Sequence, residues 1–135
     1  MKELQKFIDE WKKDDEGIKP IFISFYEDLL AFDQATYEFH ERPNVSYSLR
    51  GIHQNQKDRP LFVMIDVIDD DPEHRWLSVC FYGDMINDSE SLGDLIPEGL
   101  LGEDGYCFDL TEAAPHHQNY IRQRIREAYK NADEG

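Results

Sequence analysis

The chain has 135 residues, of which 40% are hydrophobic and 13% aromatic, and its net charge at neutral pH is −15. This length suits one domain that can bury a core without support from a metal or a disulfide, and the aromatic content is too high for a disordered chain. The negative charge argues against direct binding to nucleic acid or to an anionic membrane, because both attract positive surface.

The N-terminal part, residues 1–33, carries two helical patterns. In the segment 4–11, apolar residues recur at intervals of three and four, which places them on one face of a helix. The segment 18–32 repeats this spacing, and Pro20 fits the first turn of a helix. Its β-branched and aromatic residues are also compatible with a strand, so the second helix has a competing interpretation.

A period of two replaces the helical period between residues 35 and 110, which predicts an antiparallel sheet of about five strands. We expect the segments 61–68 and 75–82 to form a β-hairpin across a charged turn. Residues 61–65 are apolar on both faces, which is typical of a central strand that helices cover on at least one side. The expected strands are 36–41, 45–49, 61–68, 76–82 and 106–110.

A long acidic loop is expected at residues 83–105, and a C-terminal helix at 115–132. A loop of this length is usually functional or mobile, or hides a short element. Pro115 can open the final helix, in which Ile121 and Ile125 begin an apolar face. The order of N-terminal helices, sheet and closing helix predicts one α+β domain over residues 1–135, with the C-terminal helix packed on the sheet.

The negative charge is concentrated in the middle of the chain. Between residues 60 and 121 there are fourteen acidic residues and one basic residue, Arg75, which together account for −13 of the net charge. One interpretation is a solubilising surface. The other is an anionic face that steers a basic protein or collects cations. The oligomeric state stays open.

The turn after the expected strand 61–68 is the candidate metal site. Asp69, Asp71, Glu73 and His74 bring several carboxylate oxygens and one ring nitrogen close together in sequence, as a hard cation would need. A solvated turn is the alternative interpretation of the same residues.

No catalytic or cofactor-binding residue is predicted, because the chain has no GxSxG, HExxH, P-loop or dinucleotide motif. Cys80 and Cys107 lack CxxC spacing and lie in apolar strand patterns, so we interpret them as buried small hydrophobic residues, with a disulfide or a metal site as alternatives. The first six residues are charged and do not resemble a signal peptide, which favours a cytoplasmic location.

Several pieces of the chain resemble small bacterial domains of the YjbR-like and YdhG-like kind. These pieces are the strand 45–49, the hairpin 61–82, the sequence Gly-Glu-Asp-Gly-Tyr-Cys-Phe-Asp-Leu at 102–110 and the sequence Ile-Arg-Gln-Arg-Ile-Arg-Glu-Ala-Tyr at 121–129. The resemblance covers roughly residues 20–130 and implies an α+β fold. Those families have no agreed chemistry, so it implies no catalytic residues.

The order of helix, antiparallel sheet and helix, with many acidic residues, is also similar to frataxin-type iron-binding proteins. That resemblance implies divalent-cation binding, although frataxin-type proteins place their acids mainly on the first helix and first strand. Here Lys2, Lys6, Lys12 and Lys13 balance the charge of the first helix. Our leading hypothesis is a non-enzymatic intracellular domain that binds a basic protein, or regulates, through its acidic surface. The alternatives are a divalent-cation-binding protein, an acidic mimic of nucleic acid and a small-molecule enzyme without a recognised motif.

Overall fold

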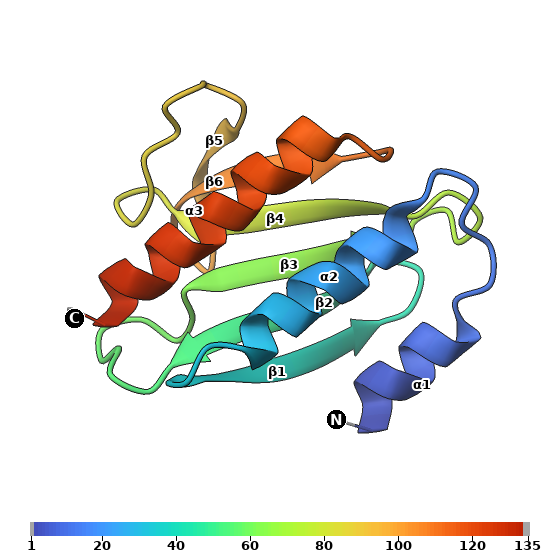
Figure 1. The fold of residues 1–135 in the computed structure, drawn as a ribbon, viewed down its shortest axis with the longest axis horizontal. Coiled ribbons are helices and arrows are strands. Elements are labelled where there is room, and N and C mark those ends of the chain that lie inside the picture. The colour runs from blue at the N-terminus through green and yellow to red at the C-terminus, as the bar shows by residue number, and fades with distance from the viewer. Residues whose placement is uncertain (1, 134–135) are drawn as a thin grey trace.

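The computed structural model describes residues 2–133 as three helices packed on one six-stranded antiparallel sheet (Figure 1). This confirms the predicted α+β class, with two N-terminal helices and a C-terminal helix on the sheet. In chain order the elements are α1 (Lys2–Glu10), α2 (Ile18–Leu30), β1 (Ala35–Arg42), β2 (Ser46–His53), β3 (Val63–Ile68), β4 (Trp76–Tyr82), β5 (Asp94–Leu100), β6 (Glu103–Leu110) and α3 (Pro115–Asp133).

The strand order in the sheet is β1-β2-β3-β4-β6-β5, with every neighbouring pair antiparallel. The predicted hairpin is confirmed, since β3 pairs with β4 from Ile68 opposite Trp76 to Met64 opposite Cys80. The apolar strand β3 is central, as expected from its sequence, and its residue Ile65 is completely buried.

All three helices pack on the same face of the sheet, where the core lies (Figure 1). Ring contacts mark this face: Phe7 of α1 stacks on Tyr47 of β2 with ring centroids 4.2 Å apart, and Tyr120 of α3 meets Phe108 of β6 at 5.9 Å. The apolar residues of the two N-terminal helical patterns are buried here, including Trp11 just beyond the end of α1. No helix among residues 2–133 is long and apolar enough to cross a membrane.

The second helical pattern forms a helix and not the strand that was its competing interpretation. Residues 18–30 are helical, and Asp14 stabilises the start of α2 by accepting hydrogen bonds from the backbone N–H groups of Ile18 (2.8 Å) and Lys19 (2.9 Å). Those two N–H groups have no partner within the helix, so the carboxylate satisfies them and offers the negative charge that a helix start favours.

The opposite face of the sheet, which no helix of the described chain covers, is called the open face below. Its residues are the alternate positions of each strand, fixed by the pairing register. They are Thr36, Glu38, His40 and Arg42 of β1; Ser46, Ser48, Arg50 and Ile52 of β2; Met64, Asp66 and Ile68 of β3; Trp76, Ser78, Cys80 and Tyr82 of β4; Gly105, Cys107 and Asp109 of β6; and Asp94 and Ile96 of β5.

The segment 83–105, expected to be one acidic loop, contains the whole of β5 and the start of β6, so the sheet has six strands instead of about five. β5 does not show the period of two because it carries Pro97 and a register shift between Ile96 and Leu100. Proline is tolerated there because β5 is an edge strand, where one side of the backbone needs no partner.

The interpretation of Cys80 and Cys107 as unbonded hydrophobic residues is wrong, because they form a disulfide. The two residues lie directly opposite each other on β4 and β6, with Cα atoms 4.1 Å apart. They are 27 positions apart in the sequence. No spacing rule links cysteines at that separation, and only the sheet register brings them together. Both belong to the open face, where Cys80 is buried and Cys107 is half-buried.

Candidate functional site

Three adjoining hollows line the end of the sheet at which β4 ends and β6 begins; we call them together the acidic groove. Their volumes are about 360, 540 and 390 Å³. The first and second share Arg59, Asp84 and Glu103, and the second and third share Gly83, Leu95 and Tyr106. Most of this lining comes from the segment 83–105, so the fold gathers part of the chain's acidic middle around one concave surface.

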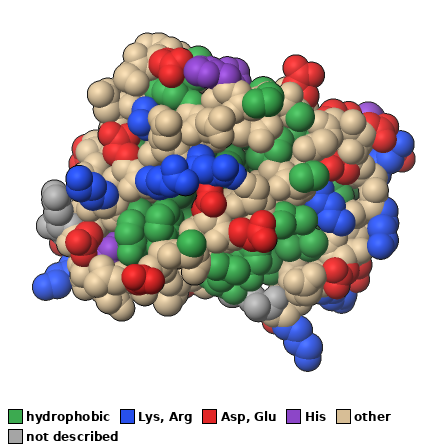
Figure 2. All heavy atoms as spheres, in the orientation of Figure 1, with side chains coloured by type: hydrophobic (Ala, Val, Ile, Leu, Met, Phe, Trp, Pro, Cys, Tyr) green, Lys and Arg blue, Asp and Glu red, His purple; other side chains and the backbone are tan. Residues whose placement is uncertain are grey.

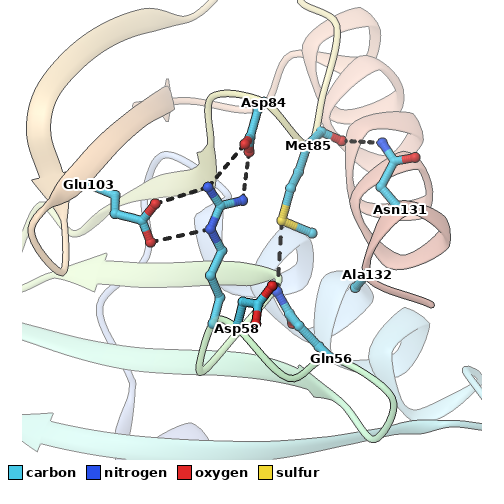
Figure 3. A pocket seen from close by; sticks show the side chains of 8 residues that line it. Gln56, Asp58, Asp84, Met85, Glu103, Asn131 and Ala132 are labelled. Carbon is cyan, nitrogen blue, oxygen red and sulfur yellow. Dashed lines mark hydrogen bonds and ion pairs between the residues drawn. The ribbon is translucent and has the colours of Figure 1, made fainter. Parts of the chain in front are cut away.

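Arg59 is the only basic residue that lines the acidic groove within the described chain. Its guanidinium donates to both oxygens of Asp84, at 2.6 and 3.0 Å, and to both oxygens of Glu103, at 2.9 and 3.2 Å (Figure 3). It also lies over the ring of Tyr82, 4.4 Å from the ring centroid. The two bidentate carboxylates use four of the five N–H donors of the guanidinium and outweigh its charge, so Arg59 is a poor site for an anionic ligand.

This ion pairing fixes the charge states at the junction of the first two hollows. The hydrogen bond from Arg59 holds the pKa of Asp84 below its ordinary value, and the bonds to Asp84 and Glu103 raise the pKa of Arg59. Burial raises the pKa of Tyr82, helped by the nearby charge of Glu103. At neutral pH the triad of one guanidinium and two carboxylates therefore carries a net charge of −1.

The third hollow is shaped by Asp88, which organises the turn between β4 and β5. Its carboxylate accepts hydrogen bonds from the N–H groups of Leu92 (3.0 Å) and Gly93 (2.8 Å) and from the hydroxyl of Tyr120 on α3. Burial alone would raise the pKa of Asp88, but these hydrogen bonds outweigh it and hold the pKa below its ordinary value.

Further contacts tie the same segment to α3. Arg124 donates to the carbonyl oxygen of Asn87 at 3.0 Å, and Asn131 donates to that of Met85 at 2.6 Å (Figure 3). The walls of the groove are thus attached to the body of the molecule at several points along 83–93.

Some carboxylates of the groove have no such structural role. Asp58 in the first hollow and Asp94 in the third form no side-chain hydrogen bond or ion pair within residues 2–133 and are exposed. Between them the floor is partly apolar, since the side chain of Leu95 is 51% exposed and Tyr106 is half-buried. In its two outer hollows the groove therefore offers carboxylates that have no partner in the described chain, and in the middle hollow it offers apolar surface beside the paired Arg59.

Three of the four candidate metal residues, Asp69, Asp71 and His74, have partners outside the candidate set or in the turn backbone. Asp69 is buried, binds Arg75 at 2.8 Å and accepts a hydrogen bond from the N–H of Asn44 at 2.8 Å. Asp71 accepts from the N–H of Glu73 at 3.2 Å.

His74, the fourth candidate ligand, lies 3.0 Å from a carboxylate oxygen of Glu16, which raises the pKa of the imidazole. Within residues 2–133 no group of three or more His, Cys, Asp or Glu side chains is arranged to hold a metal ion.

The fourteen acids of residues 60–121 fall into separate groups. Asp69, Asp70, Asp71 and Glu73 lie at the β3–β4 turn, Asp66 and Asp109 lie on the open face, and Glu112 follows β6. Asp84, Asp88, Asp94, Glu103 and Asp104 line the groove, whereas Glu90 and Glu98 belong to the same segment of the chain but do not line it. Sequence reasoning missed Arg59 as the centre of the groove because its partners lie 25 and 44 positions away. No local pattern signals a contact of that kind.

Comparison of the chain with protein-family models, with curated proteins and with solved structures gives no match. The resemblance to YjbR-like and YdhG-like domains and the similarity to frataxin-type proteins stay predictions.

Proposed function

We propose that the protein is a non-enzymatic binding domain whose acidic groove holds an extended, basic segment of a partner protein. The observation that carries the proposal is the placement of two unpaired carboxylates, Asp58 and Asp94, in the outer hollows of a groove whose one cation is already neutralised. Such a groove attracts cationic groups and repels anionic ones.

The apolar floor favours lysine and arginine side chains over small cations. Both residues have long aliphatic stems that cover apolar surface while the charged end reaches a carboxylate. Leu95 and Tyr106 offer that apolar surface between the two outer hollows. A metal ion would use the acids but not this floor.

Recognition through side chains is favoured over addition of a strand to the neighbouring edge of the sheet. The outer edge of β5 carries Pro97, and Glu98 has a left-handed backbone with φ of 57°. Both features oppose the pairing of a further strand along that edge.

The charge states support binding over catalysis. The pKa of Asp84 is moved down and that of Arg59 is moved up, so neither group is poised near neutral pH to exchange a proton. General acid–base catalysis works best with a group whose pKa lies close to the working pH.

A cytoplasmic location stays a proposal. The Cys80–Cys107 disulfide is the observation that opposes this location, because disulfides persist mainly in oxidising compartments. Trapping free thiols in freshly lysed cells decides the matter: a reduced pair supports the cytoplasm, and a fully oxidised pair contradicts it.

The binding proposal is tested by titrating the protein with a labelled, lysine-rich peptide and following fluorescence anisotropy. The double variant Asp58→Asn/Asp94→Asn should bind about tenfold more weakly, since each exposed ion pair contributes on the order of 0.7 kcal/mol. Affinity should also fall as salt is added.

The matched control is Glu3→Gln/Asp70→Asn, which removes the same charge at two exposed positions away from the groove. If this control weakens binding as much as the groove variant does, binding follows net charge alone and the groove is not the site. A glutamate-rich peptide should not bind either protein.

A further inference from the structure

The open face carries opposite charge on its two halves. The outer strands β1 and β2 present His40, Arg42 and Arg50, whereas β5 and β6 at the other side present Asp94 and Asp109. The acid among the basic group, Glu38, is bound to His40 at 2.9 Å.

The two acids of the acidic half, Asp94 and Asp109, interact with each other. Burial raises the pKa of Asp109, and the charge of Asp94 on the neighbouring strand raises it further. A basic group brought close to these two carboxylates would be attracted to both and would offset their mutual repulsion.

The middle of the open face is largely apolar. Met64 and Ile68 of β3, Trp76 of β4 and the Cys80–Cys107 disulfide form a half-buried strip between the charged halves. One oxygen of Asp66 within this strip is buried without a hydrogen-bond partner. A half-buried apolar strip of this kind gains stability when a second surface excludes the remaining water.

We infer that the open face binds the open face of a second copy of this chain, forming a dimer whose two-fold axis runs along the strand direction. Rotation about that axis exchanges the two sides of the sheet, so β1 and β2 of one copy lie over β5 and β6 of the other. By the pairing register, Arg50 then lies opposite Cys107 of the partner copy, beside both Asp94 and Asp109. Arg42 lies one open-face row beyond Asp109, and Glu38, which is bound to His40, lies opposite Asp94. Arg50 is therefore the residue on which the charge complementarity mainly depends. An axis across the strands would place like charges on each other, so charge complementarity selects the first arrangement.

The area of the face is adequate for such a dimer. Six strands about 4.8 Å apart and about 23 Å long span on the order of 650 Å². This flat area approaches the surface of about 800 Å² per partner that a standard interface buries, before side-chain relief is counted.

The net charge of −15 on each copy opposes association, so salt has two effects. At about 0.15 M salt the screening length is about 8 Å, which weakens repulsion between the acidic regions outside the interface. Facing side chains in contact are screened less. The dimer should therefore be most stable at intermediate salt. It should weaken at very low salt through net repulsion and near 1 M salt through loss of the facing pairs.

Sedimentation equilibrium of the full chain, with its disulfide intact, tests the inference. The wild type should dimerise at about 0.15 M salt, and Arg50→Glu and Asp109→Arg should each be monomeric. An equimolar mixture of the two variants should form a heterodimer, because each restores the charge that the other lacks. Arg42→Glu, which is exposed, serves as a second variant on the basic half if Arg50→Glu fails to fold.

Glu41→Lys is the control, since Glu41 is the strand neighbour of Arg42 and belongs to the other face. It should leave the dimer intact. A wild type that stays monomeric at the highest attainable concentration overturns the inference, as does failure of the mixed variants to associate. Asp94 belongs to both the open face and the acidic groove, but the substituted residues Arg50 and Asp109 do not line the groove. Their effect on dimerisation therefore tests this inference separately from the proposed peptide binding.

Discussion

Asp69 and Arg75 form an ion pair with a separation of 2.8 Å that is nearly enclosed within the β3–β4 turn. The guanidinium of Arg75 also lies over the rings of Phe7, Trp11 and Tyr47, at 5.1, 5.3 and 5.6 Å from their centroids. One basic residue thus joins α1, the connection to α2, strand β2 and the β3–β4 turn. Asp69, one of the four residues that the sequence suggested for a metal site, is the counter-ion of this residue.

The first prediction concerns this pair. Asp69→Ala should lower the free energy of unfolding by about 3–5 kcal/mol, because it leaves the charge of Arg75 buried without a partner. The measurement is urea denaturation followed by tryptophan fluorescence. Asp70→Ala removes an exposed carboxylate next to it and should change stability by less than about 0.5 kcal/mol. Equal effects of the two substitutions would show that the Asp69–Arg75 ion pair does not contribute to the free energy of unfolding.

The disulfide gives the second prediction. Cys80→Ser/Cys107→Ser should reduce the free energy of unfolding by about 3.5 kcal/mol, because the bond closes a loop of 27 positions and restricts the unfolded chain. Denaturation of the wild type with and without reductant is the companion measurement. The reduced wild type and the double variant should then unfold at similar denaturant concentrations. A double variant that unfolds at the same denaturant concentration as the oxidised wild type would contradict the prediction that the disulfide stabilises the fold.

A third prediction uses Asp66, a half-buried residue of the open face with one buried carboxylate oxygen. Burial raises the pKa of Asp66 above its ordinary value, so the folded state favours the protonated form. Stability from this group is complete below the ordinary pKa and is lost as pH rises through the raised pKa. Asp66→Asn should therefore be more stable than the wild type at pH 7, by about 1 kcal/mol. The difference in stability between the two proteins should vanish in acid. A wild type that is more stable than Asp66→Asn at pH 7 would contradict a raised pKa for Asp66.

Arg59 supplies the fourth prediction. Arg59→Gln should destabilise the fold by about 1 kcal/mol, because Asp84 and Glu103 lose their shared counter-ion at a partly exposed site. Arg59→Lys should recover only part of this, since an ammonium cannot bind two carboxylates bidentately.

The same variants should change the acid sensitivity of the protein. In the wild type the lowered pKa of Asp84 gives stability that is present above the ordinary pKa and is lost as pH falls through the lowered one. Arg59→Gln should flatten this dependence in pH-dependent thermal melting. An unchanged profile would show that the ion pair is not maintained in solution.

Much of the fold follows from periodicity that each segment carries by itself. The central strand β3 continues the apolar run 61–65, and Ile121, Ile125 and Ala128 recur at steps of four and three, a spacing that a helix uses and a strand does not. The hairpin of β3 and β4 follows from two such strands on either side of a charged turn. These elements needed no information from distant residues.

The features that were missed depend on distant partners. β5 is stabilised by β6 despite Pro97, and Cys80 meets Cys107 through the register of two strands. Arg59 acquires its role from carboxylates beyond β3 and β4. Composition located the negative charge in the middle of the chain. It could not show that the acids are divided among a turn, a groove and a face of the sheet, because the order and register of the strands decide where each acid lies.

The disulfide between β4 and β6 also bears on how the molecule would respond to proteolysis. A single cut in the exposed part of 84–93 would leave two polypeptides, each contributing to the same sheet. Because the bond joins residues on either side of that cut, the two fragments would stay covalently connected. A nicked molecule would then run as one species without reductant and as two with it, while keeping its core assembled.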